Sequence, residues 1–308
     1  MLKKQNLNIV FIGGNTYGSA GPFINFAKLC KLHKIPFCLV TNKERINYPT
    51  KRFKTLEIEL IKEKFKFIVK KNININFLKK ITNRDSIIFS VNCSWILKKD
   101  ILKYFENRIY NYHNASLPEY RGAACHSWRL MQNNYDTFIN IHRIEAKIDT
   151  GDIVTRKKIK FPKKCNNLRS SYDYIENKEV KLFENFVFKR HKILKQNKKS
   201  FYWPRLNSAK DADINWSWSA RDIISFCNAF DRPFGGAFSY INKNKIYFSN
   251  VSLVEKNTNF HPFQSGIVFR INRKGYYIAT SKGALLVKNI KSKIKIKLGY
   301  KFNSINYN

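Results

Sequence analysis

The sequence predicts an α/β protein in two parts: a Rossmann-like domain with a mostly parallel sheet, then a smaller all-β domain shaped like an OB-like barrel. Short apolar runs alternate with helical segments through the first two hundred residues, which is typical of a parallel sheet covered on both faces. From Gly235 onward, short β-branched and aromatic runs are separated by Asn and Gly turns, the pattern of an antiparallel barrel. A chain of 308 residues can hold two such cores.

The chain opens with a β-α-β unit. A buried strand at 8–12 enters Gly13-Gly14, and a helix at 21–33 and a second strand at 36–41 follow. Gly13, Gly14 and Gly18 do not have the G-x-G-x-x-G spacing, and no acidic residue clearly ends the second strand, so a dinucleotide site is not expected. These glycines instead suit tight turning and close packing of a helix on the sheet.

The remaining elements follow at short intervals. Residues 43–66 predict a loop and then a solvated strand or helix. Further strands are expected near 67–69, 86–91, 109–113, 137–144 and 153–161, and helices near 75–82, 96–105, 123–131, 172–198 and 219–230. We therefore expect a first domain over 1–200, a linker and joining helix over 201–234, and a β-barrel-like domain over 235–308.

The charge is strongly one-sided, with 58 Lys and Arg against 21 Asp and Glu and a net charge of +37. This favours a polyanionic partner such as nucleic acid, but Lys-rich compositional drift would give the same balance, and both interpretations stay open. In 291–297 the lysines occupy alternate positions. Such a charged strand face suits phosphate binding, or keeps edge strands from pairing with other chains.

Several classes are disfavoured. The six cysteines are scattered without a CxxC pair, so we expect reduced thiols in a cytoplasmic protein and neither a disulfide framework nor a metal site. No window approaches eighteen consecutive apolar residues, so no membrane span is expected. The apolar run after the basic N-terminus is too short for a signal peptide.

Polar side chains end the predicted strand at 109–113. Because side chains alternate along a strand, Asn111 and His113 point to one face, and Tyr110 and Tyr112 to the other. The carboxyl ends of parallel strands are where such sheets bind ligands. Asp149 lies further along, in Asp149-Thr-Gly-Asp152. An amide, an imidazole and a carboxylate suffice for acyl transfer to an amine.

Motifs spread over nearly the whole chain resemble a known family. The segments that carry the resemblance are Asn111-Tyr-His-Asn-Ala-Ser-Leu-Pro-Glu-Tyr-Arg-Gly-Ala-Ala124, Ile148-Asp-Thr-Gly-Asp-Ile153, Trp203-Pro-Arg-Leu206, Asp213-Ile-Asn-Trp216, Pro233-Phe-Gly-Gly-Ala-Phe238 and Gly283-Ala-Leu-Leu286. Together they resemble the formyltransferases that use 10-formyltetrahydrofolate. Those include methionyl-tRNA formyltransferase, the sugar-nucleotide amine formyltransferases and, more distantly, glycinamide ribonucleotide formyltransferase.

The resemblance implies that Asn111, His113 and Asp149 are catalytic. Asn111 and a protonated or donating His113 would stabilise the oxyanion, and Asp149 would orient His113 and help to manage the proton that the amine loses.

The resemblance also implies a folate site and contacts to the acceptor. The folate would bind near Phe89, Ser90, Val91 and Trp95, although Trp95 is as compatible with a core position. Substrate contacts are expected from Asn114, Ser116 and Arg121. Ser116 also suits a local hydrogen bond, and Arg121 a pair with Glu119.

The acceptor stays open. The whole architecture and the charge favour methionyl-tRNA. Departures from the tRNA enzymes at Asn114 and Cys125–Trp128, and the lack of a recognisable glycine-rich basic insertion, favour a nucleotide-linked amino sugar. A folate-dependent deformylase would need the same three residues. The alternative of another class is a non-catalytic polyanion-binding relative.

Overall fold

The computed structural model describes residues 7–15, 21–197 and 200–304. It divides into two compact units. The first contains the residues up to Cys125, Asp136–Phe161 and Tyr172–Pro204, and the second contains His126–Tyr135, Pro162–Ser171 and the residues from Arg205 on. No helix of the described residues is both long and apolar enough to cross a membrane.

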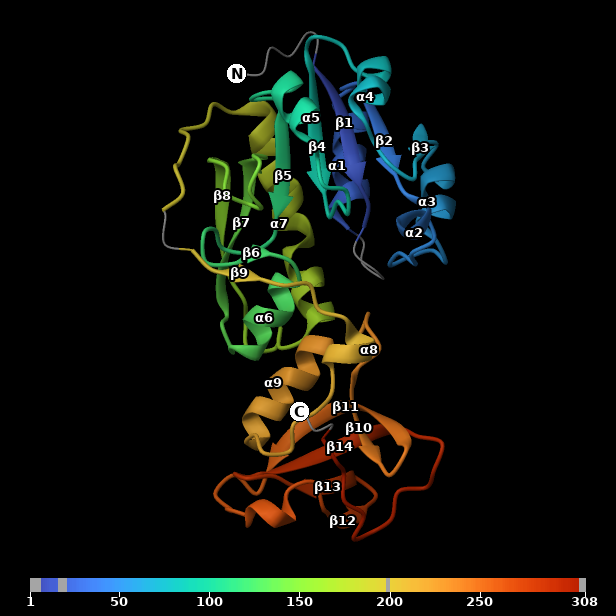
Figure 1. Ribbon diagram of the computed structural model, residues 1–308, viewed down its shortest axis with the longest axis vertical. Coiled ribbons are helices and arrows are strands. Elements are labelled where there is room, and N and C mark those ends of the chain that lie inside the picture. The colour runs from blue at the N-terminus through green and yellow to red at the C-terminus, as the bar shows by residue number, and fades with distance from the viewer. Residues whose placement is uncertain (1–6, 16–20, 198–199, 305–308) are drawn as a thin grey trace. The chain divides into compact units, whose positions relative to one another are not determined.

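The first unit is built on a sheet of seven strands among the described residues, in the order β3-β2-β1-β4-β5-β7-β8 (Figure 1). The first five of these strands are parallel, β7 is antiparallel to β5, and β8 is antiparallel to β7. The mostly parallel sheet that the sequence predicts is confirmed. The strand bounds are β1 Asn8–Gly13, β2 Phe37–Thr41, β3 Phe67–Val69, β4 Ser86–Val91, β5 Ile109–His113, β7 Asp136–Arg143 and β8 Ile153–Lys160.

Alternation along β1 explains why both faces of this sheet are covered. Val10 and Ile12 join an aliphatic cluster with Leu78 of α4 (Ile75–Ile81) and Ile101 of α5 (Lys99–Tyr104). Phe11 points the other way, into an aromatic cluster of Phe23, Phe26, Phe89, Phe183 and Phe186 from α1, β4 and α7. A strand buried on both faces must be apolar, as β1 is from Ile9 to Ile12.

The helices of the first unit begin and end close to the expected places, with informative exceptions. The region 43–66 forms two short helices, capped by Asn42 and Thr55 through the amides of Arg45 and Ile58. The bounds are α1 Pro22–Leu32, α2 Lys43–Ile46, α3 Leu56–Lys62, α4 Ile75–Ile81, α5 Lys99–Tyr104 and α7 Leu168–Phe188.

The long helix α7 differs most from the expectation of 172–198. It begins earlier because the Asn167 side chain accepts from the amide of Ser170 at 2.9 Å, as an N-cap does. It ends at Phe188 because the following segment is held by other contacts. Leu194 exchanges two backbone hydrogen bonds with Ile153 at the start of β8.

Gly13, at the end of β1, lies so close to the backbone of β4 that no side chain fits there. Its φ is +125°, and a Cβ there would lie 2.0 Å from the carbonyl oxygen of Val91. The expected role of Gly13 in close packing therefore has a physical basis. Gly18 lies outside the described residues.

The second unit contains a five-stranded antiparallel sheet in the order β10-β11-β14-β13-β12. Tyr240 of β10 pairs with Asn303, and Ile267 beside β12 pairs with Lys301. The segment 301–303 therefore bridges the two edge strands, as closure of a small barrel requires. The bounds are β10 Ala237–Ile241, β11 Asn244–Val254, β12 Val268–Asn272, β13 Gly275–Ala279 and β14 Ala284–Lys291.

The lysines of 291–297 are exposed at alternate positions, as expected, but only Lys291 lies in a strand. The charged strip formed by Lys293, Lys295 and Lys297 lies in an irregular segment after β14, in which Ile296 is buried.

Helices complete the second unit. α9 packs on the barrel through Ile223, Cys227 and Phe230. Ser127 of α6 donates to the carbonyl of Ala229, and buried Arg129 donates to Ser171. These contacts explain why α6 groups with the barrel although it precedes it by a hundred residues. The bounds are α6 Cys125–Met131, α8 Ser208–Asp211 and α9 Ala220–Phe230. The short strands β6 Arg121–Gly122 and β9 Tyr202–Trp203 pair in the first unit.

A buried carboxyl joins α7 to β5. The hydroxyl of Tyr112 donates to Glu179 Oε2 at 2.8 Å. Burial raises the pKa of Glu179 to about 8, against the lowering effect of the Tyr112 hydrogen bond. Between its unfolded pKa of about 4.3 and this folded value, the folded protein binds the extra proton. The stability due to Glu179 is therefore complete below about pH 4 and is lost as the pH rises through 8.

We expect Glu179→Gln to remove that loss. The wild-type free energy of unfolding should fall by about 1.4 kcal/mol per pH unit in this window from this one group, and the Gln variant should show a smaller slope. Urea unfolding at pH 5, 7 and 8.5 measures this, with Glu184→Gln, on the same helix, as the matched control. Equal slopes in the Glu179 variant and the wild type would contradict the assignment.

Candidate active site

Two strands present the same short motif at the carboxyl end of the sheet. Asn111 and His113 of β5 lie opposite His142 and Asn140 of β7, respectively, because the two strands are antiparallel neighbours. The side chains of Asn111 and His113 share one face, as the sequence predicts, and those of Tyr110 and Tyr112 pack into the aromatic layer on the other.

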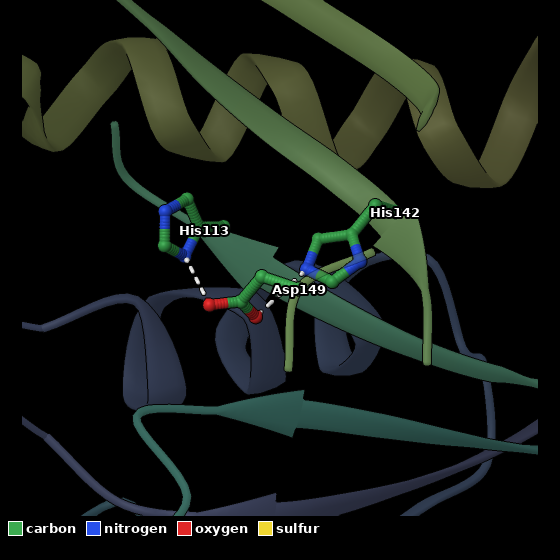
Figure 2. Close-up of side chains that lie close together, drawn as sticks. All are labelled: His113, His142 and Asp149. Atoms are coloured by element: carbon green, nitrogen blue, oxygen red, sulfur yellow. Dashed lines mark ion pairs between the residues drawn. The ribbon is translucent and has the colours of Figure 1, made fainter. Parts of the chain in front are cut away.

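Asp149 lies between two imidazole rings, as Figure 2 shows. Its Oδ2 is 3.6 Å from His113 Nδ1, and its Oδ1 is 3.4 Å from His142 Nε2. The backbone amide of Gly122 donates to Oδ2 at 2.9 Å. The three residues expected to be catalytic thus lie together, with His142 as a fourth member.

The ring of His113 has a defined orientation. Its Nε2 lies 2.6 Å from the carbonyl oxygen of Tyr120, and a carbonyl oxygen only accepts, so this nitrogen carries a proton. Nδ1 is therefore the nitrogen that faces Asp149 and gains or loses a proton. Cys125 Sγ lies 3.8 Å from Nε2.

The charges of the site support each other. Burial by itself lowers the pKa of His113, but the Asp149 carboxylate and then Cys125 outweigh burial, and the net pKa is raised. For Asp149, burial raises the pKa, while His113, His142 and the Gly122 amide together lower it far below its ordinary value. The arrangement therefore favours an imidazolium–carboxylate pair at neutral pH.

The turn that carries Asp149 is strained and supported from outside. Asp149 has a φ of +52°, which is uncommon for a residue with a side chain. A Cβ at Gly151 would lie 2.1 Å from the carbonyl oxygen of Arg143, so only glycine fits there. Gln196 holds the turn, because its Nε2 donates to the carbonyl oxygens of Asp149 and Gly151 at 2.9 and 2.7 Å.

Arg121 belongs to the same support. Its Nε and Nη2 donate to Gln196 Oε1 at 3.1 and 2.8 Å, and its Nη1 donates to Ser200 Oγ at 2.8 Å. These contacts join β6 to the Asp149 turn through Gln196. In this structure Arg121 fixes the turn, whereas the sequence predicts a substrate contact or a pair with Glu119.

The four residues expected at the folate site lie in different surroundings. The side chain of Phe89 is fully buried among Phe26, Phe183 and Phe186, so only its backbone could meet a ligand. Ser90 donates to Asn111 Oδ1 at 2.8 Å.

The carbonyl oxygen of Val91 accepts from the Gly14 amide, and its side chain is buried. Trp95 packs at the margin of the aliphatic cluster and donates to the carbonyl of Lys71 at 3.0 Å. The structure therefore does not gather these four side chains around one opening.

The remaining substrate candidates follow β5. Asn114 is half-buried directly beyond His113. Ser116 is bound to the start of β7: its amide donates to Thr137 Oγ1 at 3.0 Å, and its hydroxyl accepts from the amide of Phe138 at 3.0 Å. The local hydrogen bonding that the sequence allows for Ser116 is present.

Sequence reasoning missed His142 and Gln196. A signal for His142 exists, since Asn140-Ile-His142 repeats the Asn-x-His pattern of β5 on the strand predicted at 137–144. Nothing in the local sequence of Gln196 marks it, because its role depends on the return of the chain after α7.

His113, His142 and Asp149 also form a possible cation-binding group. Their ligand atoms all lie within 4.8 Å of one another, and two imidazoles with a carboxylate suit Zn²⁺. The sequence predicts no metal. The N–H groups of His113 and Asn111 already face the Asp149 carboxylate and His142 Nε2. These hydrogen bonds account for the close approach of the three side chains.

Comparison with known proteins gives consistent matches. The family profile described as "Formyl transferase" matches residues 7–186, and "Formyl transferase, C-terminal domain" matches residues 207–304. The bifunctional polymyxin resistance protein ArnA of Wigglesworthia glossinidia brevipalpis is 32% identical over 68% of this chain, which spans 34% of that protein. The methionyl-tRNA formyltransferase of Fusobacterium nucleatum subsp. nucleatum is 25% identical over 94% of this chain and 93% of its own.

Solved structures share the fold. The N-formyltransferase of Helicobacter canadensis, determined with folinic acid and dTDP-3-aminofucose, has a TM-score of 0.68 at 19% identity. The match covers 93% of this chain and 99% of that one. The methionyl-tRNA formyltransferase of Clostridium thermocellum has a TM-score of 0.56 at 19% identity, over 80% of this chain and 94% of its own.

Proposed function

The chain belongs to the formyl transferase family, and we propose that it transfers a formyl group from 10-formyltetrahydrofolate to a primary amine. The observation that supports this most is the meeting of an amide, an imidazole and a carboxylate at Asn111, His113 and Asp149. We expect it to act in the cytoplasm, where its six free thiols stay reduced.

The chemistry fits these groups. The amine nitrogen bonds to the formyl carbon, and the carbonyl oxygen becomes an oxyanion that the Asn111 amide and the His113 imidazolium stabilise. The bond from the carbon to N10 of the folate then breaks, N10 takes a proton, and the amine loses one. Asp149 keeps His113 charged and helps to pass the proton that the amine loses on to N10, directly or through a water.

The contacts of His113 and Asn111 with Asp149, at 3.6 and 3.5 Å, are long for hydrogen bonds. Such contacts commonly tighten when substrate binds. The folate would lie beside the loop that follows β4.

We propose methionyl-tRNA as the acceptor. Its support is the net charge of +37, the exposed lysines of the 293–297 strip, and the relatives of this name that match along most of both chains. The phosphates of tRNA would meet basic side chains and release counterions.

A nucleotide-linked amino sugar is the second candidate. The residues after His113 and at Cys125–Trp128 depart from the tRNA enzymes. Structures of sugar N-formyltransferases also match over nearly their whole length.

An acceptor screen with 10-formyltetrahydrofolate separates the two. We expect transfer to charged initiator tRNA, with an affinity that falls steeply between 50 and 200 mM salt, by about 10³-fold for six phosphate contacts. Transfer to amino-sugar nucleotides alone, with no tRNA affinity at low salt, would replace the first candidate by the second. Formate released without any amine would indicate hydrolysis.

A charge-removal variant sharpens the screen. Alanine at Lys293, Lys295 and Lys297 should weaken tRNA binding and reduce its dependence on salt. The matched control replaces Lys79, Lys80 and Lys103, three exposed lysines of α4 and α5. Equal losses in the two variants would mean that the charge acts without a defined surface.

A further inference from the structure

The Asn111 amide can lie in two ways, and its chemistry depends on which. With its NH₂ group toward the substrate it stabilises an oxyanion, and after a 180° flip its oxygen would repel one. In the structure Oδ1 accepts from Ser90 at 2.8 Å, while Nδ2 lies 3.1 Å from His142 Nε2 and 3.5 Å from Asp149 Oδ1. Something must hold the amide in this orientation.

Ser90 cannot choose between the two orientations. A hydroxyl both donates and accepts, so it would bond equally well to the NH₂ group of a flipped amide. Asp149 does choose, since a carboxylate only accepts, but its contact is long at 3.5 Å. Asp149 must also serve His113.

His142 makes the choice at closer range. Its Nδ1 lies 2.7 Å from the carbonyl oxygen of Arg143, and because that oxygen only accepts, Nδ1 carries the proton. The neutral ring of this tautomer presents Nε2 as an acceptor, which requires an NH₂ group opposite it. A ring protonated at Nε2 would instead donate to Asp149 Oδ1, 3.4 Å away, so the two forms of His142 make opposite demands on the Asn111 amide. The ring is 1% exposed and directly opposite Asn111 in the strand pairing, so it acts on the amide and has no surface for substrate.

We propose that His142 is a positioning residue: its tautomer, set by the Arg143 carbonyl, accepts one N–H of the Asn111 amide and so keeps the second N–H, whose contact to Asp149 Oδ1 is long at 3.5 Å, available to the oxyanion. We call this path, from the Arg143 carbonyl through His142 to Asn111, the amide relay. Its catalytic role rests on the proposed function. The geometry of the relay depends only on the hydrogen bonds of His142 with Arg143 and Asn111.

The tautomer of His142 can be read without turnover. Nuclear magnetic resonance of histidine-¹⁵N-labelled protein, assigned with a His142→Gln variant, should show Nδ1 protonated and Nε2 bare at neutral pH. A ring protonated at Nε2 would overturn the relay, because that nitrogen would then donate and the amide would have to flip.

Two substitutions test the effect on catalysis. His142→Leu removes the acceptor, and we expect kcat to fall about 10- to 30-fold, with KM for both substrates within about twofold, since one donor is misoriented and not lost. His142→Gln can place an amide oxygen where Nε2 was, and it should recover most of kcat. Equal losses in both variants would mean a packing role and would overturn the proposal.

A double-mutant cycle isolates the path. In an Asn111→Ala background, His142→Leu should cost no further kcat, because the amide it positions is gone. An undiminished cost in that background would refute a path through Asn111.

The outcomes separate this inference from the proposed function. Formyl transfer by a wild type whose ring is protonated at Nε2 would remove the relay and keep the function. A wild type that transfers to no amine, with Nδ1 protonated, would remove the function and keep the relay geometry. If His142→Leu fails to fold, the tautomer of His142 in the wild type, read by nuclear magnetic resonance, still tests the relay.

Discussion

Replacing His113 with alanine will lower kcat for formyl transfer by about three orders of magnitude. The substitution removes the imidazolium that the Asp149 carboxylate maintains, and with it one of the two donors available to the oxyanion. Single-turnover transfer from 10-formyltetrahydrofolate to the acceptor measures the chemical step directly. Folate affinity should change little, because the role assigned to the buried ring of His113 is to stabilise the oxyanion and not to bind the folate.

His33→Ala is the matched control for this change. His33 is exposed at the end of α1, away from the Asp149 turn, and its loss should leave kcat unchanged. Turnover of the His113 variant within about tenfold of the wild type would end the catalytic assignment.

Replacing Asp149 with asparagine will reduce kcat by about 10²- to 10³-fold and move the pH profile. The Asp149 carboxylate raises the pKa of His113 against the lowering effect of burial, so its neutralisation lowers that pKa. Activity needs the protonated ring, so the basic limb of the kcat profile should move to lower pH. Rates between pH 5.5 and 9.5 measure the shift.

Asp152→Asn provides the comparison within the same turn. The backbone carbonyl of Asp152 accepts from the Arg143 amide, a contact that the substitution keeps, and the basic limb should stay in place. A basic limb that stays in place or moves to higher pH in the Asp149 variant would contradict the pairing of Asp149 with His113.

Local pattern was sufficient where a residue's role follows from its own strand. Alternation along β5 placed Asn111 and His113 on one face and the tyrosines on the other, and the structure has them so. The apolar runs of β1 and β4 similarly predict strands buried on both faces. Such features depend on neighbours one or two positions away, which a sequence displays directly.

Local pattern was insufficient where a distant segment supplies the partner. Phe89 directly precedes Ser90, which donates to Asn111, but the Phe89 side chain points into the aromatic core formed with α7. Arg121 carries the positive charge that suits a phosphate, but Gln196 and Ser200, more than seventy residues later, accept from three of its five N–H groups. The end of α7 at Phe188 likewise follows from the pairing of Leu194 with Ile153.

The sequence by itself determined the two-part fold, the family and the meeting of Asn111, His113 and Asp149 at one end of the sheet. Only the tertiary structure decided which nitrogen of His113 faces Asp149, what holds the Asp149 turn, and that His142 lies against the Asn111 amide. The physical reason is that hydrogen-bond direction depends on the acceptor each proton meets. Those acceptors, the carbonyls of Tyr120 and Arg143, are backbone atoms that any residue type would supply.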